Sequence, residues 1–232
     1  MGKMFDFKRL TSTKLIVVLI ITLLMAGCGG SGDDSTTPSE PITYHLYDDG
    51  QFDPGYQLSF SLTGSDSTGG SWTGTVLIET KSQVQVSGQT VVPMETYVSL
   101  TETSSSYTAD GIGTTYTNPN TLITVLMEVN GVTYTPTDTS VMPELAEIGD
   151  SGALPAFSGS DGSTITGTWR LEDAGGGLAD LVQQTFQQAS PPGGPLDYNT
   201  TVRIRIDETG NPSRYSEEIY YPSSGVSVNL SS

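Results

Sequence analysis

The side chains that could carry out nucleophilic or acid–base catalysis are few in this sequence. His45 is the only histidine and Cys28 the only cysteine among 232 residues. A Ser-His-Asp triad needs a histidine as general base, and His45 lies beside a polar segment that we expect to be unstructured. A Ser-Lys pair would have to use Lys81, the only lysine after residue 14, and no distinctive serine motif accompanies it. The sequence therefore predicts no enzyme and no catalytic residues.

Carboxylates are abundant, but their spacing indicates no particular chemistry. Glycoside hydrolysis needs two carboxyl groups roughly 5 to 10 Å apart, and no pattern here places such a pair. A carboxylate-dependent enzyme acting on glycans is therefore the least favoured alternative. Asp48, Asp49 and Asp53 are candidate calcium ligands, because Ca²⁺ takes carboxylate oxygens, but they lack EF-hand spacing. The favoured interpretation is acidic turn chemistry, with no cofactor and no transition-metal site.

Two sets of side chains are candidates for ligand binding. Arg203 and Arg205 alternate along one expected strand, with Arg214 beyond the next turn. They could hold an anionic ligand or a lipid headgroup. The favoured alternative is cross-strand pairing with Glu217 or Glu218. The second set is aromatic and could line a sugar-binding face, although core packing is the favoured interpretation; it comprises eleven tyrosines with Trp72 and Trp169.

The charge balance argues against nucleic acid as a partner. Nine Lys and Arg stand against 26 Asp and Glu, for a net charge of -17. Four of these cations and one of these acids precede residue 15, so the remainder holds five cations against 25 acids. Such a field repels phosphate backbones.

The N-terminus has the pattern of an export signal. A basic stretch through Lys14 is followed by an apolar run over 15–25, which is short for a membrane span. Met25-Ala26-Gly27-Cys28 resembles the lipobox of bacterial lipoproteins. The resemblance implies that residues 1–27 are removed, that Cys28 is acylated, and that its acyl chains anchor the protein in the cell envelope. Gly29 resembles the pattern that permits outer-membrane sorting in a Gram-negative cell.

The rest of the chain divides into a tether and a β domain. Residues 28–41 hold no large apolar side chain after Cys28, which is typical of a flexible tether. From residue 42 apolar residues recur with period two between Gly, Asn, Asp and Pro, the pattern of antiparallel strands. We expect strands near 56–63, 71–80, 84–101 with a break at 87–88, 122–129, 132–135, 164–172, 202–207, 214–221 and 225–230. Asn130-Gly131 predicts a type I′ hairpin.

One segment departs from this rhythm. Six residues between Gly175-Gly176-Gly177 and Pro191-Pro192 recur at helical spacing: Leu178, Leu181, Val182, Thr185, Phe186 and Ala189. We therefore expect one amphipathic helix over about 178–189, packed on a sheet face or at a barrel end.

The chain contains a short internal sequence repeat. Gly64-Ser65-Asp66 and Gly159-Ser160-Asp161 are each followed by a Thr-Gly-Thr strand. This repeat is compatible with two interpretations: two related halves, 42–140 and 141–232, or two similar hairpins in one domain. Segments 148–152, 158–164 and 168–174 resemble uncharacterised exported lipoproteins, a resemblance that supports localisation and implies no activity.

These observations predict a mainly β protein: an antiparallel sandwich or incompletely closed barrel with one helix. The favoured function is a non-catalytic envelope lipoprotein that binds another envelope protein or has a structural role. The alternative is a carrier of a small ligand or lipid in a barrel cavity.

Overall fold

The computed structural model describes residues 42–189 and 196–232, so the expected signal peptide, Cys28 and the tether lie outside the described part. The described part contains fifteen strands and no helix. The strands are β1 Thr43–His45, β2 Gln57–Asp66, β3 Ser71–Thr80, β4 Val84–Val86, β5 Gln89–Glu102, β6 Tyr107–Thr117, β7 Thr124–Val129, β8 Val132–Pro136, β9 Leu145–Glu147, β10 Ser151–Gly159, β11 Thr164–Gly175, β12 Leu178–Gln188, β13 Leu196–Ile206, β14 Pro212–Tyr221 and β15 Val226–Ser231. Among the same residues there is no helical span fit to cross a membrane.

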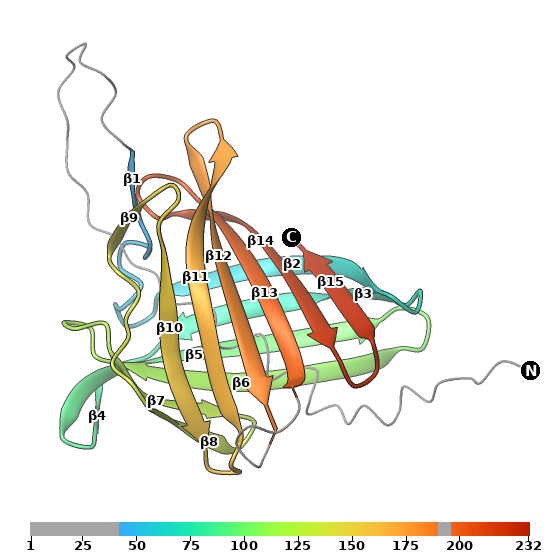
Figure 1. Cartoon of the computed structure of the whole chain (residues 1–232), viewed down its shortest axis with the longest axis horizontal. Coiled ribbons are helices and arrows are strands. Elements are labelled where there is room, and N and C mark those ends of the chain that lie inside the picture. The colour runs from blue at the N-terminus through green and yellow to red at the C-terminus, as the bar shows by residue number, and fades with distance from the viewer. Residues whose placement is uncertain (1–41, 190–195) are drawn as a thin grey trace, which may run out of the picture.

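Twelve of the strands form one closed antiparallel barrel. The sheet runs in the order β3-β2-β15-β14-β13-β12-β11-β10-β8-β7-β6-β5-β4, and a further pairing of β3 with β5 closes it, leaving β4 as an extra strand. In Figure 1 the strands β10 to β14 cross in front of β2, β3, β5 and β6, so the barrel has two sheet layers that run in different directions. The prediction of a sandwich or an incompletely closed barrel is therefore corrected to a closed barrel.

The predicted helix is wrong: residues 178–188 form strand β12, paired with β11 and β13 along its length. Leu181 points into the barrel, whereas Val182 and Phe186 lie on the outer face. Because apolar residues occur on both faces of this strand, their spacing matches that of an amphipathic helix. The inner row continues with Gln183, Thr185 and Gln187, whose polarity hides the alternation. Gly175-Gly176-Gly177 forms the turn, with φ of 77°, 67° and 77°.

Local sequence explains two of the other connections. Asn130 and Gly131 have φ of 49° and 84°, and Val129 pairs with Val132, which confirms the predicted two-residue hairpin. Gly64 allows β2 to pair with β15, because a Cβ at this position would lie 1.8 Å from the carbonyl oxygen of Asn229. A glycine is thus required where β2 pairs with β15.

The interior is packed with side chains from every strand of the barrel. Both tryptophans belong to the main cluster, with Trp72 1% and Trp169 5% exposed, which confirms core packing for them. β1 pairs with β9, and Tyr44 and Ala146 from this small sheet join the same cluster, as do Leu46, Tyr47 and Met142. Residues before β2 and between β8 and β10 therefore contribute to the core.

Candidate functional site: an arginine cleft on the outer sheet face

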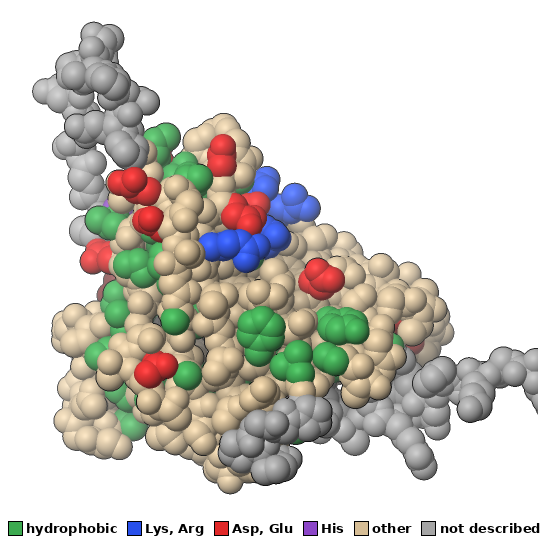
Figure 2. Space-filling view, viewed as in Figure 1, with side chains coloured by type: hydrophobic (Ala, Val, Ile, Leu, Met, Phe, Trp, Pro, Cys, Tyr) green, Lys and Arg blue, Asp and Glu red, His purple; other side chains and the backbone are tan. Residues whose placement is uncertain are grey.

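Four of the five cations in the described part of the chain lie together on the outer face of β11, β13 and β14. They are Arg170, Arg203, Arg205 and Arg214; the fifth, Lys81, is paired with Glu79 and Glu95. Figure 2 shows the blue side chains gathered in one group, with acidic ones among them. Strand alternation causes this clustering, because Arg203 and Arg205 are two residues apart and Arg205 lies directly opposite Arg214.

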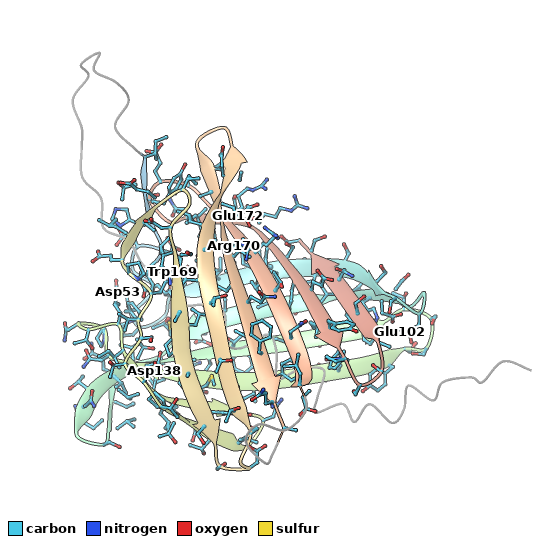
Figure 3. The ribbon with its side chains drawn as sticks, viewed as in Figure 1. Asp53, Glu102, Asp138, Trp169, Arg170 and Glu172 are labelled. Atoms are coloured by element: carbon cyan, nitrogen blue, oxygen red, sulfur yellow. The ribbon has the colours of Figure 1, made fainter. Side chains whose placement is uncertain are left out.

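Two carboxylates hold three of these guanidinium groups in place. Glu172 accepts from Arg170 Nε at 2.6 Å and from Arg203 Nη1. These bonds lower the pKa of Glu172 below its ordinary value. Asp180 accepts from Arg205 Nε at 2.9 Å and Nη2 at 3.1 Å, a bidentate pair. Figure 3 shows Arg170 and Glu172 close together on β11.

Arg214 is the fourth arginine of the group and takes no part in these ion pairs. It makes no ion pair with any described residue, although it lies opposite Arg205. Like charges directly across a strand pair are destabilising, so this pair weakens the sheet unless an anion lies between them. A cleft of about 210 Å³ opens at this point, lined by Asp180, Arg203, Arg205, Arg214 and Ser216. We call it the arginine cleft.

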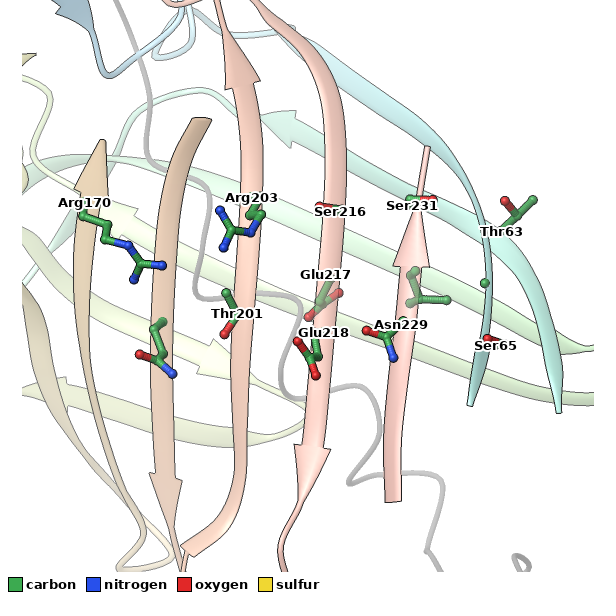
Figure 4. Close-up of a pocket in the computed structure, with 13 residues that line it drawn as sticks. Thr63, Ser65, Arg170, Thr201, Arg203, Ser216, Glu217, Glu218, Asn229 and Ser231 are labelled. Atoms are coloured by element: carbon green, nitrogen blue, oxygen red, sulfur yellow. The ribbon is translucent and has the colours of Figure 1, made fainter. Parts of the chain in front are cut away.

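A longer depression, which we call the sheet groove, adjoins the arginine cleft and shares Arg203 and Ser216 with it. Figure 4 shows the side chains that line it. Its volume is about 480 Å³. It is lined by Thr63, Gly64, Ser65, Arg170, Gln184, Thr201, Arg203, Ser216, Glu217, Glu218, Asn229, Leu230 and Ser231. All of its outward side chains are polar, and Glu218 is its only outward acid.

The predicted arginine pairing partners are corrected by the sheet register. Glu218 lies opposite Thr201, and Glu217 lies opposite Val202 with its side chain inside the barrel. Within the described residues, neither glutamate therefore forms an ion pair with an arginine. The actual partners, Glu172 and Asp180, come from β11 and β12, and Asp180 falls in the segment expected to be a helix. Because that segment was expected to be a helix, the cross-strand pairing of Asp180 with Arg205 was not predicted.

The barrel interior carries a second polar group. Glu217, Gln183, Thr185 and Thr200 are each at most 2% exposed and face the interior from β12, β13 and β14. Glu217 Oε2 accepts from the Tyr215 hydroxyl at 3.1 Å, but one oxygen of each of the four side chains has no hydrogen-bond partner among the residues that the structure describes. Burial raises the pKa of Glu217 to about 8, against the lowering effect of Tyr215.

A small internal cavity of about 20 Å³ reaches Gln183. It is lined otherwise by Thr115, Leu122, Thr124, Met127, Val141, Met142, Leu154, Pro155 and Phe157. This volume holds about one water molecule. Met142 covers Gln183, whose Nε2 lies 3.7 Å from the Met142 sulfur, and the Tyr47 hydroxyl donates to the Met142 carbonyl at 2.5 Å. A larger ligand would therefore require the segment around Met142 to move.

The candidate calcium ligands do not form a metal-binding group. The Asp48 carboxylate accepts from the Tyr56 hydroxyl, and the Asp53 amide donates to the Gly50 carbonyl at 2.8 Å. Within 42–189 and 196–232, no three His, Cys, Asp or Glu side chains are placed to hold a metal ion. Asp53 lies away from Arg170 and Glu172 in Figure 3. His45 is part of β1, outside both the arginine cleft and the sheet groove.

Comparisons with known proteins add no identity: no protein-family model, curated protein or solved structure matches this chain. The arginine cleft, the sheet groove and the interior polar group are therefore the features on which a function can be argued.

Proposed function

We propose that this chain is a non-catalytic binding protein of the bacterial cell envelope that holds an anionic group of its partner in the arginine cleft. The observation that carries the proposal is the gathering of four of the five described cations on one face of a strongly acidic chain. Glu172 and Asp180 offset only two of the four charges, and Arg214 has no ion-pair partner in the described part of the chain. Guanidinium groups suit carboxylate, sulfate and phosphate, each of which accepts two parallel hydrogen bonds.

The test is the thermal stability of the protein in low millimolar sulfate, with chloride at equal ionic strength as the reference. Sulfate should raise the melting temperature of the wild type, because an anion that binds only the folded state stabilises it. Arg214→Gln should lose most of this increase and should melt slightly higher without sulfate, because the repulsion with Arg205 is removed. Lys81→Gln is the matched control, since it removes one cation elsewhere. Equal sulfate responses in wild type and Arg214→Gln would contradict the proposal.

The envelope anchor is part of the same proposal and rests on the lipobox resemblance at Cys28. Acyl chains on Cys28 would hold the protein at a membrane surface, that of the outer membrane in a Gram-negative cell. Cys28→Ser should abolish metabolic labelling by a fatty-acid analogue, whereas His45→Ser should not. Labelling that persists in Cys28→Ser would refute the anchor.

A second candidate function is that of a small-ligand carrier. The closed barrel and the unpartnered oxygens of Gln183, Thr185, Thr200 and Glu217 favour it. Native mass spectrometry of protein released from its own envelope distinguishes the two candidates. A carrier should retain an added small mass, whereas the favoured function requires no small molecule in the barrel.

A further inference from the structure

The sheet groove is too long for a single small anion. Its lining begins at Arg170 on β11 and ends at Thr63 and Ser65 on β2, so it crosses six neighbouring strands. Adjacent strands are about 4.8 Å apart, which gives a length of roughly 24 Å. Because the groove shares Arg203 and Ser216 with the arginine cleft, one extended ligand could occupy both.

The lining of the groove suits a hydroxyl-rich chain better than a protein surface. Its outward side chains offer hydroxyl and amide groups, from Thr63, Ser65, Gln184, Thr201, Ser216, Asn229 and Ser231. The only large apolar residue among the lining is Leu230, whose side chain is buried inside the barrel. Protein interfaces usually have an apolar core surrounded by a polar rim, and this groove has no such core.

Two aromatic side chains lie beside the groove on the same outer face. Phe186 is two residues beyond Gln184 on β12, and Tyr220 is two residues beyond Glu218 on β14. Asn199 of β13 lies between them, opposite both. Tyr220 is 39% exposed, which is unusual for a large apolar residue of this barrel. Exposed aromatic faces provide flat apolar surfaces on which the C–H faces of sugar rings can pack.

We propose that the sheet groove binds an acidic polysaccharide, with carboxylate or sulfate groups at Arg203, Arg205 and Arg214 and sugar hydroxyls along the polar lining toward β2. This inference rests on the proposed function and adds the class of ligand. Charge complementarity supports it, because the arginines are the positive region of a chain that otherwise repels acidic polymers. Glu218 limits affinity, since its carboxylate faces the same groove.

The experiment measures binding of four polymers to the immobilised full chain: polygalacturonate, dextran sulfate, neutral dextran and polyglutamate. The two acidic polysaccharides should bind, neutral dextran should not, and polyglutamate should bind at least tenfold more weakly. Thr201→Trp places a bulky ring in the middle of the groove and should weaken binding of polygalacturonate at least tenfold. Thr114→Trp, at a half-buried threonine on β6 outside the groove, is the matched control.

Glu218→Gln is expected to bind more tightly. Because misfolding would weaken binding, a gain in affinity cannot be explained by a misfolded variant. It should raise the affinity for polygalacturonate severalfold, because one repulsive carboxylate is removed. Thr201→Trp should keep the sulfate-dependent rise in melting temperature, since it leaves the arginine cleft intact.

Three outcomes would overturn the inference. Tight binding of polyglutamate that Thr201→Trp does not weaken would identify an acidic peptide as the partner. Equal binding of neutral dextran would show that charge is not recognised. Absence of polysaccharide binding, with the sulfate response intact, would remove the sheet groove from the account and leave the proposed function standing. If sulfate does not raise the melting temperature of the wild type, the proposed function itself is overturned.

Discussion

Glu217→Gln is expected to stabilise the barrel at neutral and mildly alkaline pH and to flatten the dependence of its stability on pH. Glu217 is 2% exposed, lies opposite Val202 and Leu230, and has one carboxyl oxygen without a hydrogen-bond partner. Ionisation of this carboxyl group inside the barrel is costly, so its pKa rises from 4.5 to about 8. Glutamine keeps the shape and an acceptor for the Tyr215 hydroxyl without the titration.

The direction of the effect follows from proton binding. Between pH 4.5 and about 8 the folded state keeps the Glu217 proton, whereas the unfolded state has released it. The contribution of Glu217 to stability therefore falls as the pH rises through this window, by roughly 1 kcal/mol per pH unit. Above pH 8 the folded protein carries the full cost of the buried charge.

Urea unfolding at pH 5, 6, 7 and 8 measures this dependence. The free energy of unfolding of Glu217→Gln minus that of the wild type should grow with pH across the window. Glu218→Gln is the matched control, because its neighbouring carboxylate lies on the outer face and is exposed. Parallel pH profiles for the wild type and Glu217→Gln would show that Glu217 is not held protonated inside the barrel.

Asp66→Asn is the second substitution with a large expected effect, at about 2 to 3 kcal/mol of lost stability. Asp66 Oδ1 accepts from the amides of Thr68 at 2.8 Å and Gly70 at 3.1 Å, while Oδ2 accepts from Trp72 Nε1 at 2.9 Å. One asparagine oxygen can replace Oδ1, but its amide group would then face the indole N–H of Trp72, which is buried in the core. A buried donor would be left without an acceptor.

Asp161→Asn is the natural comparison, because Asp161 occupies the same position as Asp66 in the repeated Gly-Ser-Asp motif, in the turn between β10 and β11. Its Oδ1 accepts from the amide and hydroxyl of Ser163, at 2.9 Å and 2.6 Å, and one asparagine oxygen can serve both. We expect a loss below about 1 kcal/mol at neutral pH. Thermal unfolding of both variants checks the order, and a larger loss for Asp161→Asn would contradict the role given to Trp72.

Acid should reduce the difference between the wild type and Asp66→Asn. Burial by itself would raise the pKa of Asp66, but its hydrogen bonds from Thr68, Trp72 and Gly70 outweigh burial and lower it. Such a carboxylate contributes stability above its ordinary pKa of 3.8, and this contribution is lost as the pH falls through the lower folded value.

Strands with apolar alternation were predictable from the sequence. The expected strand at 71–80 matches β3, and the break at 87–88 separates β4 from β5. β6 was missed because its inward positions include Ala109, Gly113 and Thr115, which give little apolar signal. Closure of the barrel was not predictable either, since the pairing of β3 with β5 joins strands without a local sequence signature.

The candidate site was only partly predictable. Alternation placed Arg203 and Arg205 on one face, and the structure confirms this. Arg170 was not part of the prediction, because its place beside Arg203 depends on the register of β11, β12 and β13. The ion-pair partners Glu172 and Asp180 follow from the same register, and no spacing within the chain encodes it.

The arginine side chains themselves provide the most direct test of the central claim, that an anionic partner binds in the arginine cleft. The chain has five arginines: four lie on this face, and Arg9 belongs to the expected signal peptide. An NMR spectrum of the arginine Nε–Hε groups therefore reports almost entirely on the candidate site. Titration with sulfate, and then with polygalacturonate, should shift the signals of Arg203, Arg205 and Arg214 to saturation. Signals that stay unmoved through both titrations would contradict the account.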